Sequence, residues 1–455
     1  MKRRNFLKST LAGSAITLGA GLSLTELANS QSQPSGYKAV VMIFLNGGND
    51  GNDIIVPTDG AFKDYQKARP SIALGSGDLT AFAGSYMGHS MGINNALSPL
   101  MPLFQQKRLA FLINAGTLVQ PTSVSDVLNG RAKLPPFLFS HPEQVQTVMG
   151  WTGDEDQSGW GGRGIEAMAG YKSFKAPLMA LDSSGSTLVT GQKSRFVAAN
   201  SNFSRNLGEA NLLDNTNPWT RTIESLTRLQ SENQAQAEYA RTFRASFLDG
   251  VELAKVDQVT PQPSGNFANT DIGKKLKFLA RTMHYFRTAG ASRQVFSVQW
   301  GGFDTHTNQR GATTNSGSQT QDTQLAELAA ALTAFDDSIK AAGMDQEVVV
   351  LVASEFGRTL DPASGGGSDH AWGSHWWVIG GPVQGGQMLG QHFPSLVLRG
   401  VDDGDPGGRG YWVPQISSDQ VAGELLTWLG VPQEKLLTVL PNLANFSTRK
   451  VGFIA

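Results

Sequence analysis

Four stretches of nearly continuous apolar residues predict strands that are buried on both faces. They cover residues 38–45, 108–114, 294–300 and 347–353. Each is rich in aliphatic or aromatic residues and lacks the polar alternation of a half-exposed strand. Runs of this kind are typical of a parallel sheet that helices cover on both sides.

Two segments carry apolar residues at spacings of three and four, which predicts amphipathic helices. One covers residues 276–286 and precedes Gly290, and the other covers residues 325–339 and precedes Gly343, a glycine placed as a C-terminal cap. Strands that alternate with helices predict an α/β fold with a mostly parallel sheet.

The region between residues 211 and 259 is polar and helix-prone, with scattered apolar anchors. We interpret it as a helical insertion and not as an independent domain. Residues 37–455 then form one domain, since α/β folds often exceed the usual domain size.

Polar or glycine-containing segments follow all four predicted strands, at residues 46–53, 115–117, 301–306 and 354–359. In open parallel sheets, ligands bind beyond the carboxyl ends of the strands. Because three of these segments carry acidic residues, the sequence predicts a site at this edge of the sheet.

Residues 1–30 have the pattern of an export signal. Lys2, Arg3 and Arg4 form a basic start, residues 11–27 are weakly apolar, and residues 28–30 are small, as at a cleavage site. The paired arginines predict the twin-arginine pathway, which would make the mature protein periplasmic or secreted. A membrane-spanning helix is the alternative, but the run holds many small and polar residues.

The composition excludes several function classes. The 37 basic and 38 acidic residues nearly balance, which predicts no broad attraction to nucleic acid or to anionic membranes. The chain has no cysteine, so disulfides, thiolate metal sites and a cysteine nucleophile are excluded. It also lacks a phosphate-binding P-loop motif, which disfavours nucleotide chemistry.

Carboxylate and imidazole side chains gather after the predicted strands and in a glycine-rich segment near residue 370. The candidate metal ligands are Asp50, Asp304, His306, Glu355, Asp369, His370 and His375. Carboxylate oxygens and imidazole nitrogens from several loops suit a divalent ion, namely zinc, manganese, magnesium or calcium. The choice between His370 and His375 stays open.

Several of these residues also have a purely structural interpretation. Asp50 and Asp304 lie in glycine-containing segments, where aspartate commonly forms turns. Glu355 is placed to cap a helix that would begin after it. Residues 365–367, three glycines, predict a mobile loop, and residues 402–405 are interpreted as a turn because their spacing differs from that of a calcium loop.

Ser140 and Arg358 are the candidate catalytic residues. Ser140 precedes a helix expected to begin at Pro142, so its hydroxyl is either an N-cap or a nucleophile. Arg358 would clamp an anionic substrate through two N–H groups, with a surface ion pair as the alternative.

The double-arginine leader and four motifs together resemble one family. The motifs are FLNGGNDGNDIIVP after the first strand, GFDTH, SEFGRT and GSDHAWGSHWWVIGGP. In this order they resemble the bacterial domain-of-unknown-function family 1501 over essentially the whole mature chain. The resemblance implies the alkaline phosphatase and sulfatase clan, with a three-layer α/β/α sandwich and bound metal ions.

The clan's pattern implies roles for particular residues. Asp50 stands where the clan has a metal ligand, and Ser140, with Thr122 behind it, stands for the nucleophile. Asp304 and His306 look like a shortened form of the clan's Asp-x-x-x-His pair.

One departure from the clan concerns the segment after the fourth strand. Glu355-Phe356-Gly357 takes the place of the clan's Asp-His-Gly, so a phenylalanine stands where the second imidazole belongs. Either Asp369 and His370 supply the missing ligand, or one metal site is lost.

These observations predict an exported metal-dependent hydrolase of phosphate or sulfate esters, acting on a small molecule or a polysaccharide. The alternative is a secreted binding or assembly protein that keeps the fold without catalysis, for which a protein partner is possible. Such a protein would use exposed aromatic side chains. The candidates are Trp151, Trp160, Trp376 and Trp377.

Overall fold

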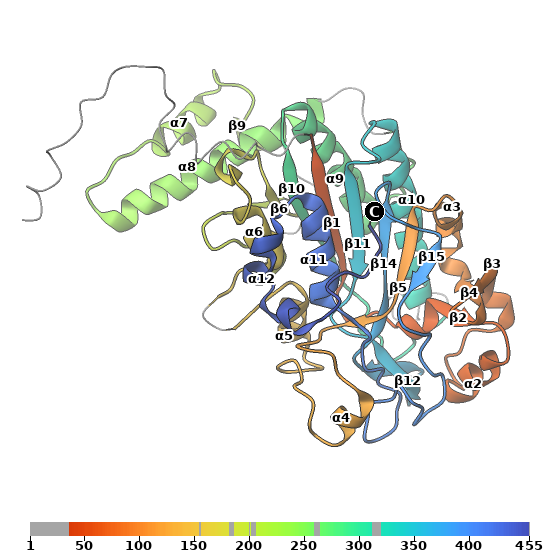
Figure 1. Cartoon of the computed structure of the whole chain (residues 1–455). Helices are drawn as coiled ribbons and strands as arrows, with labels where there is room; N and C mark the ends of the chain where they lie inside the picture. Colours follow the sequence, from red (N-terminus) through yellow and green to blue (C-terminus); the bar gives the residue numbers. More distant parts are fainter. Residues whose placement is uncertain are drawn as a thin grey trace, which may run out of the picture.

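A mixed nine-stranded sheet forms the centre of the molecule (Figure 1). The computed structural model describes residues 36–153, 156–181, 186–199, 201, 206–258, 264–311 and 320–454. The predicted export signal, residues 1–30, lies outside these residues.

The strands of this sheet follow the order β15-β5-β14-β11-β1-β10-β6-β7, with β16 beside β5. Their bounds are β1 Lys38–Leu45, β5 Leu109–Gly116, β6 Leu178–Ala180, β7 Val197–Ala198, β10 Arg293–Trp300, β11 Val348–Ala353, β14 Ser374–Gly380, β15 Gln387–Leu389 and β16 Ile416–Ser417. The four apolar runs are β1, β5, β10 and β11, so their prediction is confirmed.

Strand β14 is the element that the sequence pattern did not reveal. It pairs antiparallel with both β11 and β5, whereas β1 pairs in parallel with β10 and β11. The predicted mostly parallel sheet is therefore confirmed, with one reversed strand inserted into it. This strand carries His375 into the interior of the sheet, where the side chain is fully buried.

Alternate side chains of β1 enter two separate apolar cores, which shows that both faces of the sheet are covered. Val41 and Ile43 pack in one core, and Val40 and Met42 pack in the other. The predicted three-layer α/β/α sandwich is confirmed by this division.

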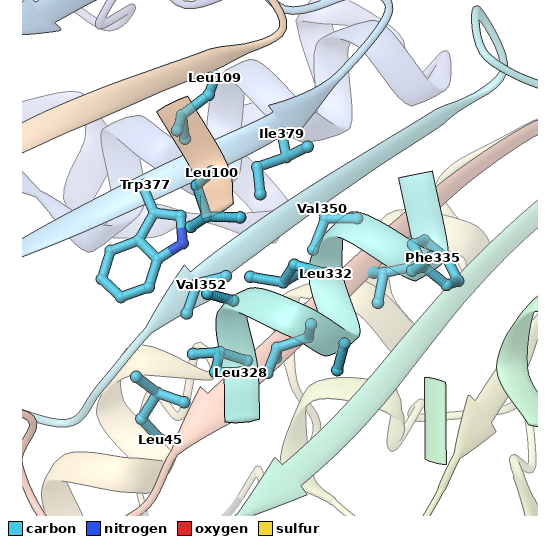
Figure 2. Close-up of a cluster of buried hydrophobic side chains, with 14 of the residues drawn as sticks. Leu45, Leu100, Leu109, Leu328, Leu332, Phe335, Val350, Val352, Trp377 and Ile379 are labelled. Atoms are coloured by element: carbon cyan, nitrogen blue, oxygen red, sulfur yellow. The ribbon is translucent and has the colours of Figure 1, made fainter. Parts of the chain in front are cut away.

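Helices α9 (Asp271–Thr288) and α10 (Gln321–Ala341) cover the first face, as their apolar spacing predicts. Figure 2 shows Leu328 and Leu332 of α10 pointing at Val350 and Val352 of β11. The opposite face is covered by four further helices. These are α5 His141–Val148, α6 Trp160–Glu166, α11 Ser418–Leu429 and α12 Leu436–Val439.

Smaller elements surround the sandwich. They are β2 Ile55–Pro57, β3 Leu79–Tyr86, β4 His89–Asn94, β8 Asn206–Leu207, β9 Ala210–Asn211, β12 Arg358–Ala363, β13 Gly367–His370, α2 Ala61–Ala68, α3 Met101–Gln105, α4 Val124–Leu128, α7 Pro218–Leu226 and α8 Gln234–Ala254. Helices α7 and α8 lie in the region that we expected to be helical, and they extend away from the sheet as an arm (Figure 1).

Two local expectations prove wrong. The glycines at 365–367 form the turn and first residue of the β12–β13 hairpin and not an irregular mobile loop. Glu355 caps no helix, because strand β12 follows it.

Residues 88–92 read GHSMG and match the nucleophile motif G-x-S-x-G, so the expectation that the chain lacks this motif is wrong at the level of sequence. They lie in the β3–β4 hairpin, not in the strand-to-helix turn that this motif requires. We therefore assign Ser90 no catalytic role.

None of the helices in the described part of the chain is long and apolar enough to cross a bilayer.

Candidate metal centre

Four elements far apart in the sequence deliver five side chains to one place at the edge of the sheet. Asp304 and His306 follow strand β10, and Glu355 follows strand β11. His370 ends β13, and His141 is the first residue of α5. This is the edge that the polar segments after the strands predict.

Four donor atoms converge there: the Nε2 atoms of His141, His306 and His370, and Oδ1 of Asp304. The Nε2 atom of His370 lies 3.0 Å from that of His141 and 3.1 Å from that of His306. Asp304 Oδ1 lies 3.0, 3.3 and 3.5 Å from the Nε2 atoms of His306, His370 and His141.

The other nitrogen of each imidazole is fixed by a hydrogen-bond acceptor. His141 Nδ1 lies 2.7 Å from Glu355 Oε1, and His306 Nδ1 lies 2.8 Å from Asp369 Oδ1. His370 Nδ1 lies 2.9 Å from the carbonyl oxygen of Phe139. Since a carbonyl and ionised carboxylates only accept, each Nδ1 donates a proton to its partner, and each ring turns its Nε2 atom toward the other donor atoms.

This donor set fits a metal ion. When the three rings are neutral, their facing Nε2 lone pairs cannot hydrogen-bond to one another, and a cation among them would satisfy these lone pairs. Ligands of a tetrahedral ion with bonds near 2.05 Å lie about 3.3 Å apart. The donor atoms of His141, Asp304 and His370 have such separations, 3.0, 3.3 and 3.5 Å, and form a group that could hold an ion. His306 Nε2 lies close to Asp304 and His370 but outside this group. Carboxylate and carbonyl acceptors behind the imidazoles are also the usual support of metal-bound histidine.

The centre is partly open to solvent. The side chains of His306 and Asp304 are 42% and 48% exposed, whereas Glu355 behind His141 is fully buried. The hydrogen bond that His141 donates to Glu355 raises the pKa of the His141 imidazole, and burial lowers the pKa of His370.

Arg358 positions Asp304 and is not free to clamp a substrate. Its Nη2 donates to Asp304 Oδ1 at 2.5 Å. The remaining donors point at backbone carbonyls of the neighbouring loops, those of Gly47, Gly48, Phe303 and Ser368. Burial acts to raise the pKa of Asp304, but the hydrogen bond and the positive charge of Arg358, with smaller contributions from His306 and His141, together bring this pKa below its ordinary value.

Asp369 supports His306 and does not join the four converging atoms. Its second oxygen accepts from Nη1 of Arg409 at 2.6 Å, and Arg409 also approaches Asp361. His306, Asp369 and Arg409 thus form a chain of hydrogen bonds from the centre to the loop before residue 412.

Asp50, predicted as a ligand, is committed to other partners. It is fully buried and forms an ion pair with Arg69. Gln309 Nε2 donates to it at 2.7 Å, and Asn52 donates to it through both backbone and side-chain nitrogens. These donors occupy both of its oxygens, so the structure does not bring Asp50 to the centre.

His375 also lies apart from the centre. Of the two histidines that the sequence left open as ligands, only His370 is among the converging groups. Its ring stacks on Trp412 at 5.3 Å, and its Nδ1 accepts from the backbone N–H of Asn114. Complete burial lowers the pKa of His375 to about 3, so the ring is neutral. The sequence does not distinguish His375 from His370 as a ligand. They differ in the structure because His375 lies in strand β14, inside the sheet, whereas His370 ends β13.

Ser140 is the N-cap residue of α5, and its hydroxyl donates to the carboxylate of Glu143. It therefore lies next to His141 in sequence but is not among the converging groups.

Three of the four tryptophans considered for ligand binding are buried in the core. Trp160, Trp376 and Trp377 are each at most 2% exposed, and Trp151 is half-buried. Core packing, the expected role of most of these tryptophans, therefore holds for three of them, and they offer no exposed ring to a ligand or partner.

Sequence reasoning missed His141 and its neighbours. The segment FLFSHPEQ was examined for Ser140, while the imidazole one residue later joins the centre. Phe139, whose carbonyl orients His370, has φ of +78°, a left-handed conformation rare for an aromatic residue. The usable signal was a histidine at a helix start in a chain with only seven.

The fold is similar to those of several solved enzymes. The PsFucS1 sulfatase from Pseudoalteromonas sp. shares 11% identity, with 90% of this chain and 71% of that chain covered and a TM-score of 0.34. The phosphonate monoester hydrolase SpPMH from Silicibacter pomeroyi shares 11% identity, with 88% of this chain and 74% of that chain covered and a TM-score of 0.32. Similarities of this size do not identify an activity.

No curated protein matches the sequence. The family described as "Protein of unknown function (DUF1501)" matches residues 37–394, most of the chain and every residue of the centre. The chain belongs to this family.

Proposed function

We propose that this protein is an exported, metal-dependent hydrolase of phosphate or sulfate esters. The observation that carries the proposal is the convergence of three imidazole Nε2 atoms with Asp304 Oδ1 at a partly open place. His141, His306, His370 and Asp304 would hold one divalent ion. Three imidazoles favour zinc over manganese, magnesium or calcium, which prefer oxygen ligands.

When bound, such an ion polarises an ester oxygen and lowers the pKa of a coordinated water. The chain's own residues hold the arrangement. Glu355 fixes the tautomer and orientation of His141, and Asp369 does the same for His306. Arg358 holds the carboxylate of Asp304 in place.

The nucleophile is either Ser140 or water. The Ser140 hydroxyl already donates to Glu143, and that carboxylate would receive its proton during an attack. A Ser140→Ala variant that keeps full activity would assign the attack to water.

Asp50 supports a site with one ion. Arg69 already neutralises it, so a second ion would find no free carboxylate there. The proposed export depends on the twin-arginine pattern of residues 1–30. We also propose that residues 37–455 form a single domain, with a helical insertion at residues 211–259.

Metal analysis of the mature protein tests the proposal. We expect one equivalent of a divalent ion in the unaltered protein, and its loss in His141→Ala and in Asp304→Ala/His306→Ala. His392→Ala is the matched control, because His392 also contacts an aspartate but lies elsewhere. The loaded protein is then screened against phosphate monoesters, phosphodiesters and sulfate esters.

A folded protein that takes up no zinc, manganese, magnesium or calcium would overturn the metal centre. Equal metal content in the His141→Ala variant would overturn the assignment of the ligands.

A further inference from the structure

A cavity of about 760 Å³ lies beside the metal centre and shares three residues with it, His141, Asp304 and Glu355. Most of its other walls are uncharged. Amide and hydroxyl side chains line it, namely Asn46, Gln146, Gln157, Gln299, Ser186, Thr187 and Thr190. A few apolar side chains, including Met149 and Phe196, complete the walls. The part of a substrate that enters this cavity therefore meets neutral hydrogen-bonding groups.

Among the described residues, no lysine or arginine lines the cavity. The two arginines nearest to the donor atoms are already committed. Arg358 is buried and donates to carbonyls and to Asp304, and Arg409 donates to Asp369 and contacts Asp361. Arg358 has no donor left for a substrate anion. Arg409, whose side chain is 33% exposed, donates through Nε and Nη1 to two carboxylates that offset its charge.

The charges at the centre limit what it can neutralise. The protein contributes three negative and two positive charges there. The negative charges are the carboxylates of Asp304, Glu355 and Asp369, and the positive charges are the guanidinium groups of Arg358 and Arg409. With a divalent ion bound, the site would have no more than one net positive charge. A second negative charge on the substrate would face Asp304 and Glu355 without compensation.

We propose that the substrate is an ester with a single negative charge, a sulfate monoester or a phosphodiester, whose remaining part is uncharged and hydrogen-bonding. This inference rests on the proposed hydrolase function and narrows it. A phosphate monoester, which carries two negative charges at neutral to alkaline pH, is the substrate that the site excludes.

Binding of three stable anions with the same ring tests the inference. Benzenesulfonate and O-methyl phenylphosphonate carry one negative charge, and phenylphosphonate carries two at alkaline pH. Titration calorimetry on the metal-loaded full-length mature protein should show tighter binding of both monoanions than of the dianion. If the protein binds one monoanion more tightly than the other, the tighter one indicates whether sulfate esters or phosphodiesters are the substrates. Either result supports the inference.

A charge placed in the cavity wall should reverse this order. Gln146 is half-buried on α5 and lines the cavity, so Gln146→Lys supplies the missing cation. We expect the affinity for phenylphosphonate, relative to benzenesulfonate, to rise about tenfold. Gln146→Met is the matched control of similar length without charge, and it should leave the ratio unchanged.

The outcomes separate this inference from the function on which it rests. A protein that binds no metal overturns the function and the inference together. A metal-loaded protein that binds the dianion more tightly, or binds none of the three anions, overturns only the inference. A Gln146→Lys variant that keeps the ratio of the unaltered protein also contradicts it.

Discussion

At the scale of single residues, the centre depends on acceptors that lie behind the imidazoles. Glu355 is buried and holds His141 Nδ1 at 2.7 Å, while Gly47 N–H and Ser354 Oγ–H donate to the same carboxylate. We expect Glu355→Gln to keep the fold and to weaken metal affinity roughly tenfold or more, because a neutral amide holds the ring less firmly. Competition with a chelator measures the affinity.

A second carboxylate–imidazole pair provides the control for this change. His392 Nε2 lies 2.7 Å from Asp402, away from the centre. Asp402→Asn should leave the metal affinity unaltered. Equal effects of the two substitutions would show that Glu355 has no special role.

Asp419 determines part of the pH dependence of stability. It lies in the first turn of α11, and burial raises its pKa to about 6 although Arg163 opposes the shift. The folded state therefore binds more protons than the unfolded state between pH ~4 and pH ~6, and stability falls as pH rises through this window.

Asp419→Asn should remove this contribution. The free energy of unfolding of the variant, relative to the unaltered protein, should rise by about 3 kcal/mol from pH ~4 to pH ~7. Urea denaturation across this range measures the difference. A difference that does not change with pH would contradict the assignment.

At the scale of elements, the ends of β1 and β10 approach each other so closely that only glycine fits at position 47. Gly47 has φ of +119°, and a Cβ atom there would lie 2.2 Å from the backbone nitrogen of Asp304. Gly47→Ala should therefore displace Asp304, lower the free energy of unfolding and weaken metal binding together.

Gly290, after α9, separates the effect of this contact from the effect of backbone conformation. Its φ is +87°, and nothing lies within 4 Å of an added Cβ. Gly290→Ala should cost about 1–2 kcal/mol of stability for the left-handed conformation and leave metal affinity intact. If Gly47→Ala has no larger effect than Gly290→Ala, the close approach of the two strand ends does not position the centre.

At the scale of the whole molecule, the arm formed by α7 and α8 stands apart from the sandwich that holds the centre (Figure 1). Its own small core contains Leu212, Phe247 and Ala254, while Trp219 and Tyr239 are 59% and 73% exposed. An element with so few buried contacts opens more readily than the sheet.

Limited proteolysis checks this difference. Trypsin should cut first after Arg228, whose side chain is 62% exposed at the end of α7, and the nicked protein should retain its metal. First cleavage within helices α9 or α10, which cover the sheet, or loss of metal on nicking of the arm, would contradict it.

Local patterns determined much of the architecture. The apolar runs specified β1, β5, β10 and β11, and apolar spacing specified α9 and α10, because burial on both faces or on one stripe leaves a direct mark in sequence. Strand β14 was not predicted, because the tryptophans and the histidine in its sequence do not indicate the direction in which it pairs.

The sequence by itself determined the edge of the sheet at which polar chemistry gathers, and it identified Asp304, His306 and His370 as candidates. Only the tertiary structure decided which donors meet. His141 contacts His370, which lies 229 positions later in the chain. Asp50 is paired with Arg69 and does not reach the centre, and His375 is buried in strand β14. The reason is physical: a strand is recorded in the residues that form it, but the partner of a charge depends on long-range packing that no local pattern contains.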